Sequence, residues 1–343
     1  MHLKKLLLIF SIFWVFLSFS QSLHSPFSEE VLTVPQIKAP CDLKKIAEKK
    51  QLPTIKIYGE NHASSESKKL HEELTFEARR GECVVGLEGV LCSNSQHILR
   101  DYLLSVTRRE PIPGDQNRFF GIEDEMAFCL AILLKNHNEA KKYQAQGNLD
   151  ALSNLITKTK KDLNRYAFFR EVFEKFKNKD TDQVSTRSQK FFINYLSDNL
   201  KNQPQEPLKD IEKKLNEMLQ GLPQSLEALT LTMIDTIKSK KTKTSRYVPA
   251  DLEKLVKDYF KSEDASLVTK TVTLEWRNFI FSENVLKAYC LALSKENTPK
   301  SFDVVVGKLH VPGIEKLLKE NFEGTLSSKV LTSYLPYKVN KSL

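Results

Sequence analysis

Short apolar runs of β-prone residues occur near both ends of the chain. Such runs, apolar at nearly every position and bounded by glycine or acidic residues, are typical of strands buried on both faces of a parallel sheet. Helical periodicity over Ser65–Arg80 and from about Asp124 to Ala145 alternates with the first three runs, which predicts βαβ units. The four runs are Thr54–Tyr58, Cys83–Leu87, Phe119–Ile122 and Phe302–Val306.

The middle of the chain has a different pattern. From about Asn148 to Leu293 the apolar residues recur at helical spacing, and prolines and glycines divide the stretch into segments. The α/β pattern returns at Phe302, and Lys329–Ser333 is a candidate last strand. The prediction is an α/β fold with a mostly parallel sheet, flanking helices and a large all-helical insertion. The predicted segments are a signal peptide (1–20), a lead-in (21–50), a first core part (51–147), a helical insertion or cap (148–269) and a second core part (270–343).

The N-terminal residues have the pattern of a secretory signal peptide. Lys4 and Lys5 precede an apolar run over residues 6–19, and small polar residues follow, with Ser20 as the expected cleavage position. The run is short for a full membrane span. We therefore expect export to the periplasm or medium; the alternative is an uncleaved anchor formed by residues 6–19.

Composition and charge narrow the classes of partner. The chain is 41% apolar with 11 glycines, as expected for a folded, helix-rich protein. Its formal charge is +9, but the basic cluster at residues 238–246 has no interleaved aromatic residues, so no nucleic-acid partner is expected.

None of the five cysteines forms a CxxC pair, which argues against a thiolate zinc site. Cys83 and Cys129 lie in apolar contexts and are predicted to be buried thiols, and export would allow one or two disulfides.

Two turns with the same pattern are the main candidates for chemistry. Gly59–His62 and Gly307–His310 each follow a predicted strand, and Glu60 lies inside the first turn. Glu88 and Glu123 follow two other strands. Ligands bind at the carboxyl ends of parallel strands, so these side chains are candidates for a divalent metal site or an acid–base cluster. Capping of the next helix is the alternative role for a strand-end acid.

The predicted helix Thr271–Leu293 carries polar residues among its apolar ones. Arg277 is the residue of interest, because an arginine beside clustered acids balances their charge or binds an anionic group through two hydrogen bonds. The alternative is an ordinary amphipathic helix with a surface arginine.

Four segments together resemble the TraB/Tiki/erythromycin-esterase-like/ChaN superfamily, in its Tiki/TraB-like or haem-uptake-like branch. They are GENH, VGLEG, WRNFIFSENV and VVVGKLHVPGIEKLL, and the resemblance covers roughly residues 53–125 and 270–335. It implies a shared site at Glu60, His62, Glu88, Arg277 and His310, with Asn278 and Asn284 as further matches. Members of this superfamily include metal-dependent peptidases, esterases that activate water with a histidine, and haem-binding proteins.

Three functions follow as expectations. The first is a metal-assisted hydrolase of peptides or small esters, in which Arg277 stabilises the developing anion. The metal or the water is held by His62 and His310 with one or two of Glu60, Glu88 and Glu123. The second is an exported binding protein for haem or another iron complex. The third is a helical effector or interaction protein with an inactive site. The candidate axial ligands of a haem are Tyr58, Tyr247 and Tyr289.

Overall fold

The structure is a computed structural model of the chain, and its residues 1–36 are not described. The described residues are 37, 39–49, 51–62, 64–91, 112–178, 187–197, 208–241, 247–262, 266–294, 298–322 and 330–334. The predicted signal peptide, its alternative as an anchor at residues 6–19, and Cys92 lie outside them. Among the described helices, none combines the length and the apolar character needed to cross a membrane.

Five strands form one parallel sheet in the described part of the chain, which confirms the predicted α/β class. The strand order is β3-β2-β4-β1-β5, and every neighbouring pair is parallel. The strand nearest the N-terminus therefore pairs with the two nearest the C-terminus. The strands are β1 (Thr54–Glu60), β2 (Cys83–Leu91), β3 (Phe119–Glu123), β4 (Ser301–Gly307) and β5 (Leu331–Tyr334).

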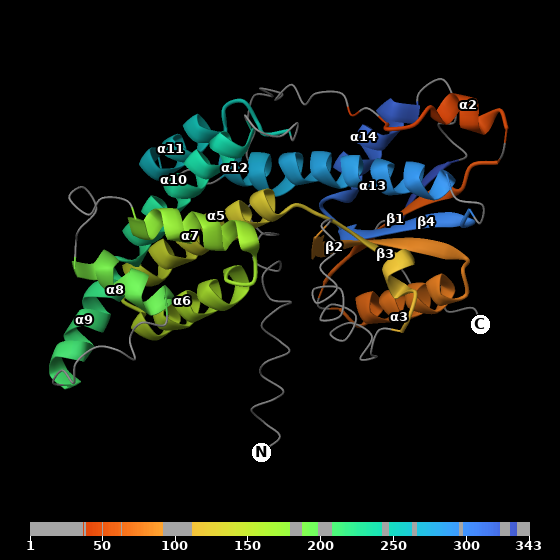
Figure 1. Ribbon diagram of the computed structural model, residues 1–343. Helices are drawn as coiled ribbons and strands as arrows, with labels where there is room; N and C mark the ends of the chain where they lie inside the picture. Colours follow the sequence, from red (N-terminus) through yellow and green to blue (C-terminus); the bar gives the residue numbers. More distant parts are fainter. Residues whose placement is uncertain are drawn as a thin grey trace, which may run out of the picture. The chain divides into compact units, whose positions relative to one another are not determined.

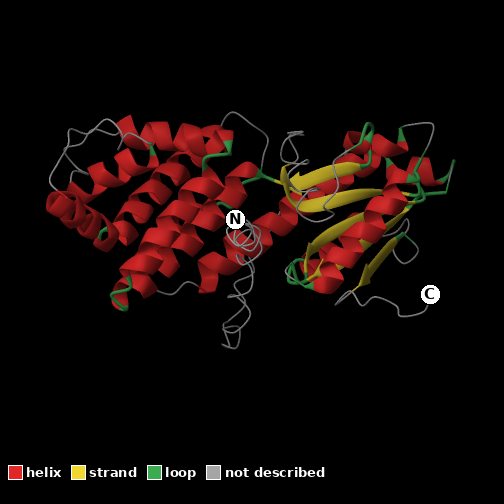
Figure 2. Ribbon diagram, turned by 90° about the horizontal axis from the view of Figure 1, so that it is seen from below, coloured by secondary structure: helices red, strands yellow, loops and turns green. Residues whose placement is uncertain are grey.

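Helices cover both faces of this sheet (Figures 1 and 2). On one face α3 (Ser65–Arg79) packs its buried leucines against Val85 and Val305, since these strand residues point to the same side. The Ser64 hydroxyl accepts a hydrogen bond from the Ser67 amide and caps this helix. The other helices of this unit are α2 (Leu43–Ala47), α13 (Arg277–Leu293), α14 (Val311–Phe322) and the 3₁₀ turn η2 (Asp115–Asn117).

A disulfide joins the two sequence segments that make up the sheet unit. Cys41, just before α2, is bonded to Cys290 near the end of α13. Nearby, the Tyr289 hydroxyl donates to the Pro53 carbonyl at 2.7 Å. Cys83 and Cys129 are buried and form no disulfide within the described residues, as predicted.

The helical unit is larger than the insertion that the sequence predicted. It spans Glu125–Trp276, whereas we placed its limits at 148 and 269. The reason is that the helix at 125–145 packs against the helices that follow it and belongs to their core, not to that of the sheet. The described helices are α5 (Glu125–Ala145), α6 (Leu149–Leu163), α7 (Ala167–Asn178), α8 (Arg187–Leu196), α9 (Leu208–Gln220), α10 (Leu222–Lys241), α11 (Leu252–Ser262), α12 (Ser266–Val268) and the π-helix η4 (Thr269–Trp276).

Candidate functional site

The two Gly-x-x-His turns lie side by side at one edge of the sheet. Strands β1 and β4 are neighbours, and their register places Glu60 opposite Gly307. The Lys308 amide donates to the Glu60 carbonyl at 3.1 Å, so the two turns also contact each other beyond the strands. This is the carboxyl edge of a parallel sheet, where ligands bind in such folds.

Glu60 is a buried carboxylate held by three side chains. Its Oε1 accepts a hydrogen bond from Nδ1 of His62 at 2.7 Å. Its Oε2 is 2.9 Å from Nε2 of His71 and also accepts from the Ser67 hydroxyl. Burial by itself would raise the pKa of Glu60, but the two histidines hold it well below its usual range. Because a carboxylate only accepts hydrogen bonds, Nδ1 of His62 carries a proton.

Arg277 forms a buried charge cluster with two of the predicted glutamates. Its side chain is 1% exposed. Nη2 lies 2.6 Å from Oε2 of Glu123 and 2.8 Å from Oε1 of Glu88, and Nε lies 3.2 Å from Oε1 of Glu123. Burial raises the pKa of Glu123 although Arg277 opposes that change. For Glu88, burial is outweighed by His310, Arg277 and His62, and its pKa falls to about 2.

His310 is held in a neutral state between two helix residues. Its Nδ1 donates to Oδ1 of Asn278 at 2.6 Å, and its Nε2 lies 3.3 Å from Nη1 of Arg277, which can only donate. Burial lowers the pKa of His310 to about 3, so the ring is uncharged near neutral pH. Glycine at position 313 leaves room for Asn278, because a Cβ there would lie 2.1 Å from Nδ2 of Asn278.

His62 has a more exposed side chain than Glu60, Glu88 or His310. Its side chain is 15% exposed, against 4% or less for Glu60, Glu88 and His310. Its Nε2 lies 3.7 Å from Oε2 of Glu88. Burial would lower the pKa of His62, but Glu60 and Glu88 raise it above its ordinary value of 6.5.

Gly307 lets the side chains of His62 and Glu88 approach the strand closely. A Cβ at Gly307 would lie 3.0 Å from Nε2 of His62 and 3.5 Å from Oε2 of Glu88. The Gly307 amide donates to that same oxygen at 2.6 Å. Glycine therefore leaves room beside Nε2 of His62, an atom that is itself buried.

All six predicted site residues meet in this cluster: Glu60, His62, Glu88, Glu123, Arg277 and His310. Ser67 and His71 belong to it as well, and the sequence reading missed them. Their spacing of four residues, on the helix that follows the first turn, was the available signal. Asn284, a weaker match, instead donates to the Ile122 carbonyl at 3.0 Å and fixes α13 to β3.

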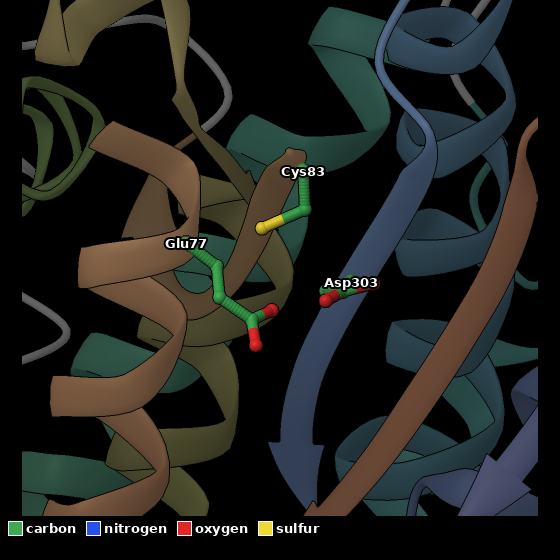
Figure 3. A group of neighbouring side chains, drawn as sticks. All are labelled: Glu77, Cys83 and Asp303. Atoms are coloured by element: carbon green, nitrogen blue, oxygen red, sulfur yellow. The ribbon is translucent and has the colours of Figure 1, made fainter. Parts of the chain in front are cut away.

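The predicted metal ligands are largely engaged with Arg277. Both oxygens of Glu123 and one of Glu88 bind the guanidinium, which occupies the position that a cation would take between them. Within the described residues, one group of three metal-ligand atoms lies within 4.8 Å of one another, and it consists of Glu77, Cys83 and Asp303 (Figure 3). The strand-end cluster therefore fits a metal ion poorly.

The three tyrosines considered as haem ligands lie in different surroundings. Tyr58 stacks on Tyr334 at the face of the sheet that α3 covers. The Tyr289 hydroxyl is hydrogen-bonded to the Pro53 carbonyl, and Tyr247 belongs to the helical unit. Nothing in the described residues supports a haem site.

The arrangement combines a neutral histidine, a more basic histidine with a bound carboxylate, and a buried arginine–glutamate cluster. A histidine whose Nδ1 is held by a carboxylate is suited to accept a proton at Nε2. Comparison with family models, curated proteins and solved structures found no match for this chain.

Proposed function

We propose that this protein is a hydrolase of esters or peptides in which His62 activates a water molecule without a metal ion. The observation that carries the proposal is the 2.7 Å hydrogen bond between Glu60 and His62. It fixes the ring and places Nε2, a buried atom, next to Gly307, where no side chain intervenes. A carboxylate–histidine pair of this kind performs general acid–base catalysis.

The proposed reaction needs one proton to move twice. Nε2 of His62 takes a proton from water as the water oxygen attacks the carbonyl carbon of the substrate. The resulting imidazolium is stabilised by Glu60, whose carboxylate Ser67 and His71 hold in place. The imidazolium then returns the proton to the leaving alcohol or amine as the carbon–oxygen or carbon–nitrogen bond breaks.

In this proposal Arg277 is a positioning residue. Its guanidinium is buried and already shared by Glu88 and Glu123, so it is not disposed to bind substrate directly. Its contribution is to keep Glu88 ionised beside His62 and to donate to His310. This corresponds to the charge-balancing role considered from the sequence and not to its alternative, direct binding of an anionic group.

We also propose that the protein is exported. The signal-peptide pattern at residues 1–20 supports this, and so does the Cys41–Cys290 disulfide, since such bonds persist in oxidising compartments. If the protein is exported, non-reducing mass spectrometry of the cell fraction that contains it will find the linked peptides and a chain that starts at Gln21.

The test is hydrolysis of a panel of chromogenic esters and labelled peptides by the purified chain after treatment with chelator. His62→Ala is expected to lower kcat/KM by about a hundredfold or more. His137→Gln is the matched control, because this histidine is also buried but contacts Tyr259 in the helical unit. Unchanged hydrolysis in His62→Ala refutes the proposal. Activity that vanishes with chelator and returns with a divalent ion supports the metal-assisted mechanism instead.

A further inference from the structure

A second group of polar side chains lies on the face of the sheet covered by α3, away from the turns of the strand-end site. Glu77 comes from α3, Cys83 from the start of β2 and Asp303 from β4. In the strand register Cys83 pairs with Ser301, and Val85 pairs with Asp303. The side chains of Cys83 and Asp303 therefore both lie near the amino ends of their strands. Figure 3 shows the three side chains, which come from different elements, pointing toward one another.

Asp303 is the unusual member of this group. Its side chain is 0% exposed, yet neither carboxylate oxygen accepts a hydrogen bond from any residue that the structure describes. The Ser301 hydroxyl and the Cys83 thiol are near but lack hydrogen-bonding geometry. Burying a carboxylate without hydrogen bonds is unfavourable, so Asp303 is a candidate for binding a cation.

Lys56 does not fill that role. Its Nζ lies 3.8 Å from Oδ1 of Asp303, beyond hydrogen-bonding distance, and its side chain is 30% exposed. It offsets part of the negative charge while leaving the lone pairs of both oxygens unused.

We propose that Glu77, Cys83 and Asp303 bind a zinc ion, a site with one thiolate that the absence of a CxxC pair gave no reason to expect. One oxygen from each carboxylate and the sulfur of Cys83 lie within 4.8 Å of one another. Zinc accepts cysteine sulfur together with carboxylate oxygen, and three protein ligands leave a fourth position for water.

Geometry, charge and access all suit this ion. Ligand atoms around tetrahedral zinc are roughly 3.4–3.7 Å apart, so closure needs a shift of about 1 Å. The exposed side chain of Glu77 can supply that shift and also gives the ion a path from solvent. The three anionic ligands, a divalent ion and the Lys56 ammonium together sum to zero charge.

The ion would join α3 to β2 and β4 and stabilise the sheet unit. This inference is independent of the proposed hydrolase, because it uses none of the residues of the strand-end site. It assigns a purpose to a buried carboxylate that the proposed reaction does not use.

Cobalt(II) is the probe, because a cysteine thiolate bound to it gives a charge-transfer band in the near ultraviolet. The full-length chain in a Cys92→Ser background is stripped with chelator, reduced only mildly, and titrated with cobalt(II). We expect one equivalent to produce the band. Cys83→Ser should abolish it, while Cys129→Ser, which changes the other buried thiol, should leave it intact.

Glu77→Gln addresses the risk that a core variant fails to fold, because Glu77 is on the surface of α3. It is expected to weaken cobalt binding on the order of ten- to a hundredfold, and zinc should raise the Tm of the wild type more than that of this variant. A His62→Ala/His310→Ala variant should keep the band, which separates this site from the strand-end cluster. Absence of the band in the wild type at saturating cobalt, or its persistence in Cys83→Ser, overturns the proposal.

Discussion

Replacement of Arg277 by methionine tests how much the buried ion pairs of Arg277 stabilise the sheet unit. The variant keeps most of the side-chain volume but removes the cation that binds Glu123 and Glu88. The structure shows no other arginine or lysine among the ion-pair partners of these two glutamates in the described residues. Two buried carboxylates are thus left without their principal counter-charge.

The expected loss of stability follows from that burial. Removing one partner of a buried ion pair costs about 3–5 kcal/mol, because the remaining charge stays out of water. The loss must depend on pH. Burial already raises the pKa of Glu123, and without Arg277 its pKa rises further, so the folded variant binds more protons than the unfolded chain. The stability of the variant therefore increases as pH falls toward the pKa of an unfolded glutamate, and its deficit shrinks.

Hydrogen exchange of the β4 amides, followed by mass spectrometry at pH 7.5 and pH 5, measures the opening free energy of the sheet unit itself. Lys319→Met is the matched control, since the Lys319–Glu315 pair on α14 is exposed and should contribute about 1 kcal/mol or less. Refutation would be a deficit of about 1 kcal/mol or less for Arg277→Met at pH 7.5, or a deficit that does not change with pH.

Two further predictions concern the histidines. The kcat/KM of the proposed hydrolase should rise with pH with a midpoint above 6.5, because His62 must be unprotonated to act and Glu60 and Glu88 raise its pKa. Glu60→Gln should shift that midpoint to lower pH and reduce the plateau by about tenfold or more, and an unmoved midpoint contradicts this role. Gly313→Ala should displace Asn278 and cost about 1–3 kcal/mol in thermal unfolding. The ring ¹⁵N shifts of His310 should change with it, and unchanged shifts would show that Asn278 does not hold the ring.

The sequence predicted the strands better than it predicted the unit boundaries. A parallel strand buried on both faces has a distinctive apolar run, and the polar residues after Gly59 and Gly307 stand out against it. Helix α5 is also apolar and follows a strand, so periodicity alone could not tell whether it packs on the sheet or on other helices. Whether α5 packs on the sheet or on other helices depends on contacts with residues far away in the sequence, which the local pattern does not contain.

The candidate site was predictable in its strand-end members and unpredictable in its pairings. Position at a strand end placed Glu88 and His310 at one edge of the sheet. The sequence offered both charge balance and anion binding as roles for Arg277, and spacing alone could not choose between them. The disulfide pairing was open for the same reason, because it depends on where α13 ends relative to the lead-in.

The pairing of β1 with β4 has a consequence for the order in which the chain folds. Thr54 pairs with Ser301, and the disulfide joins residues 249 positions apart, whereas the helical unit is one continuous stretch. Contacts between distant residues form slowly, and local helical contacts form quickly. A chain that emerges N-terminus first therefore has its helical unit available to fold while β1 still lacks both neighbours. The strand-end site is then completed only once β4 has joined the sheet, and no fragment that stops short of β4 can contain it.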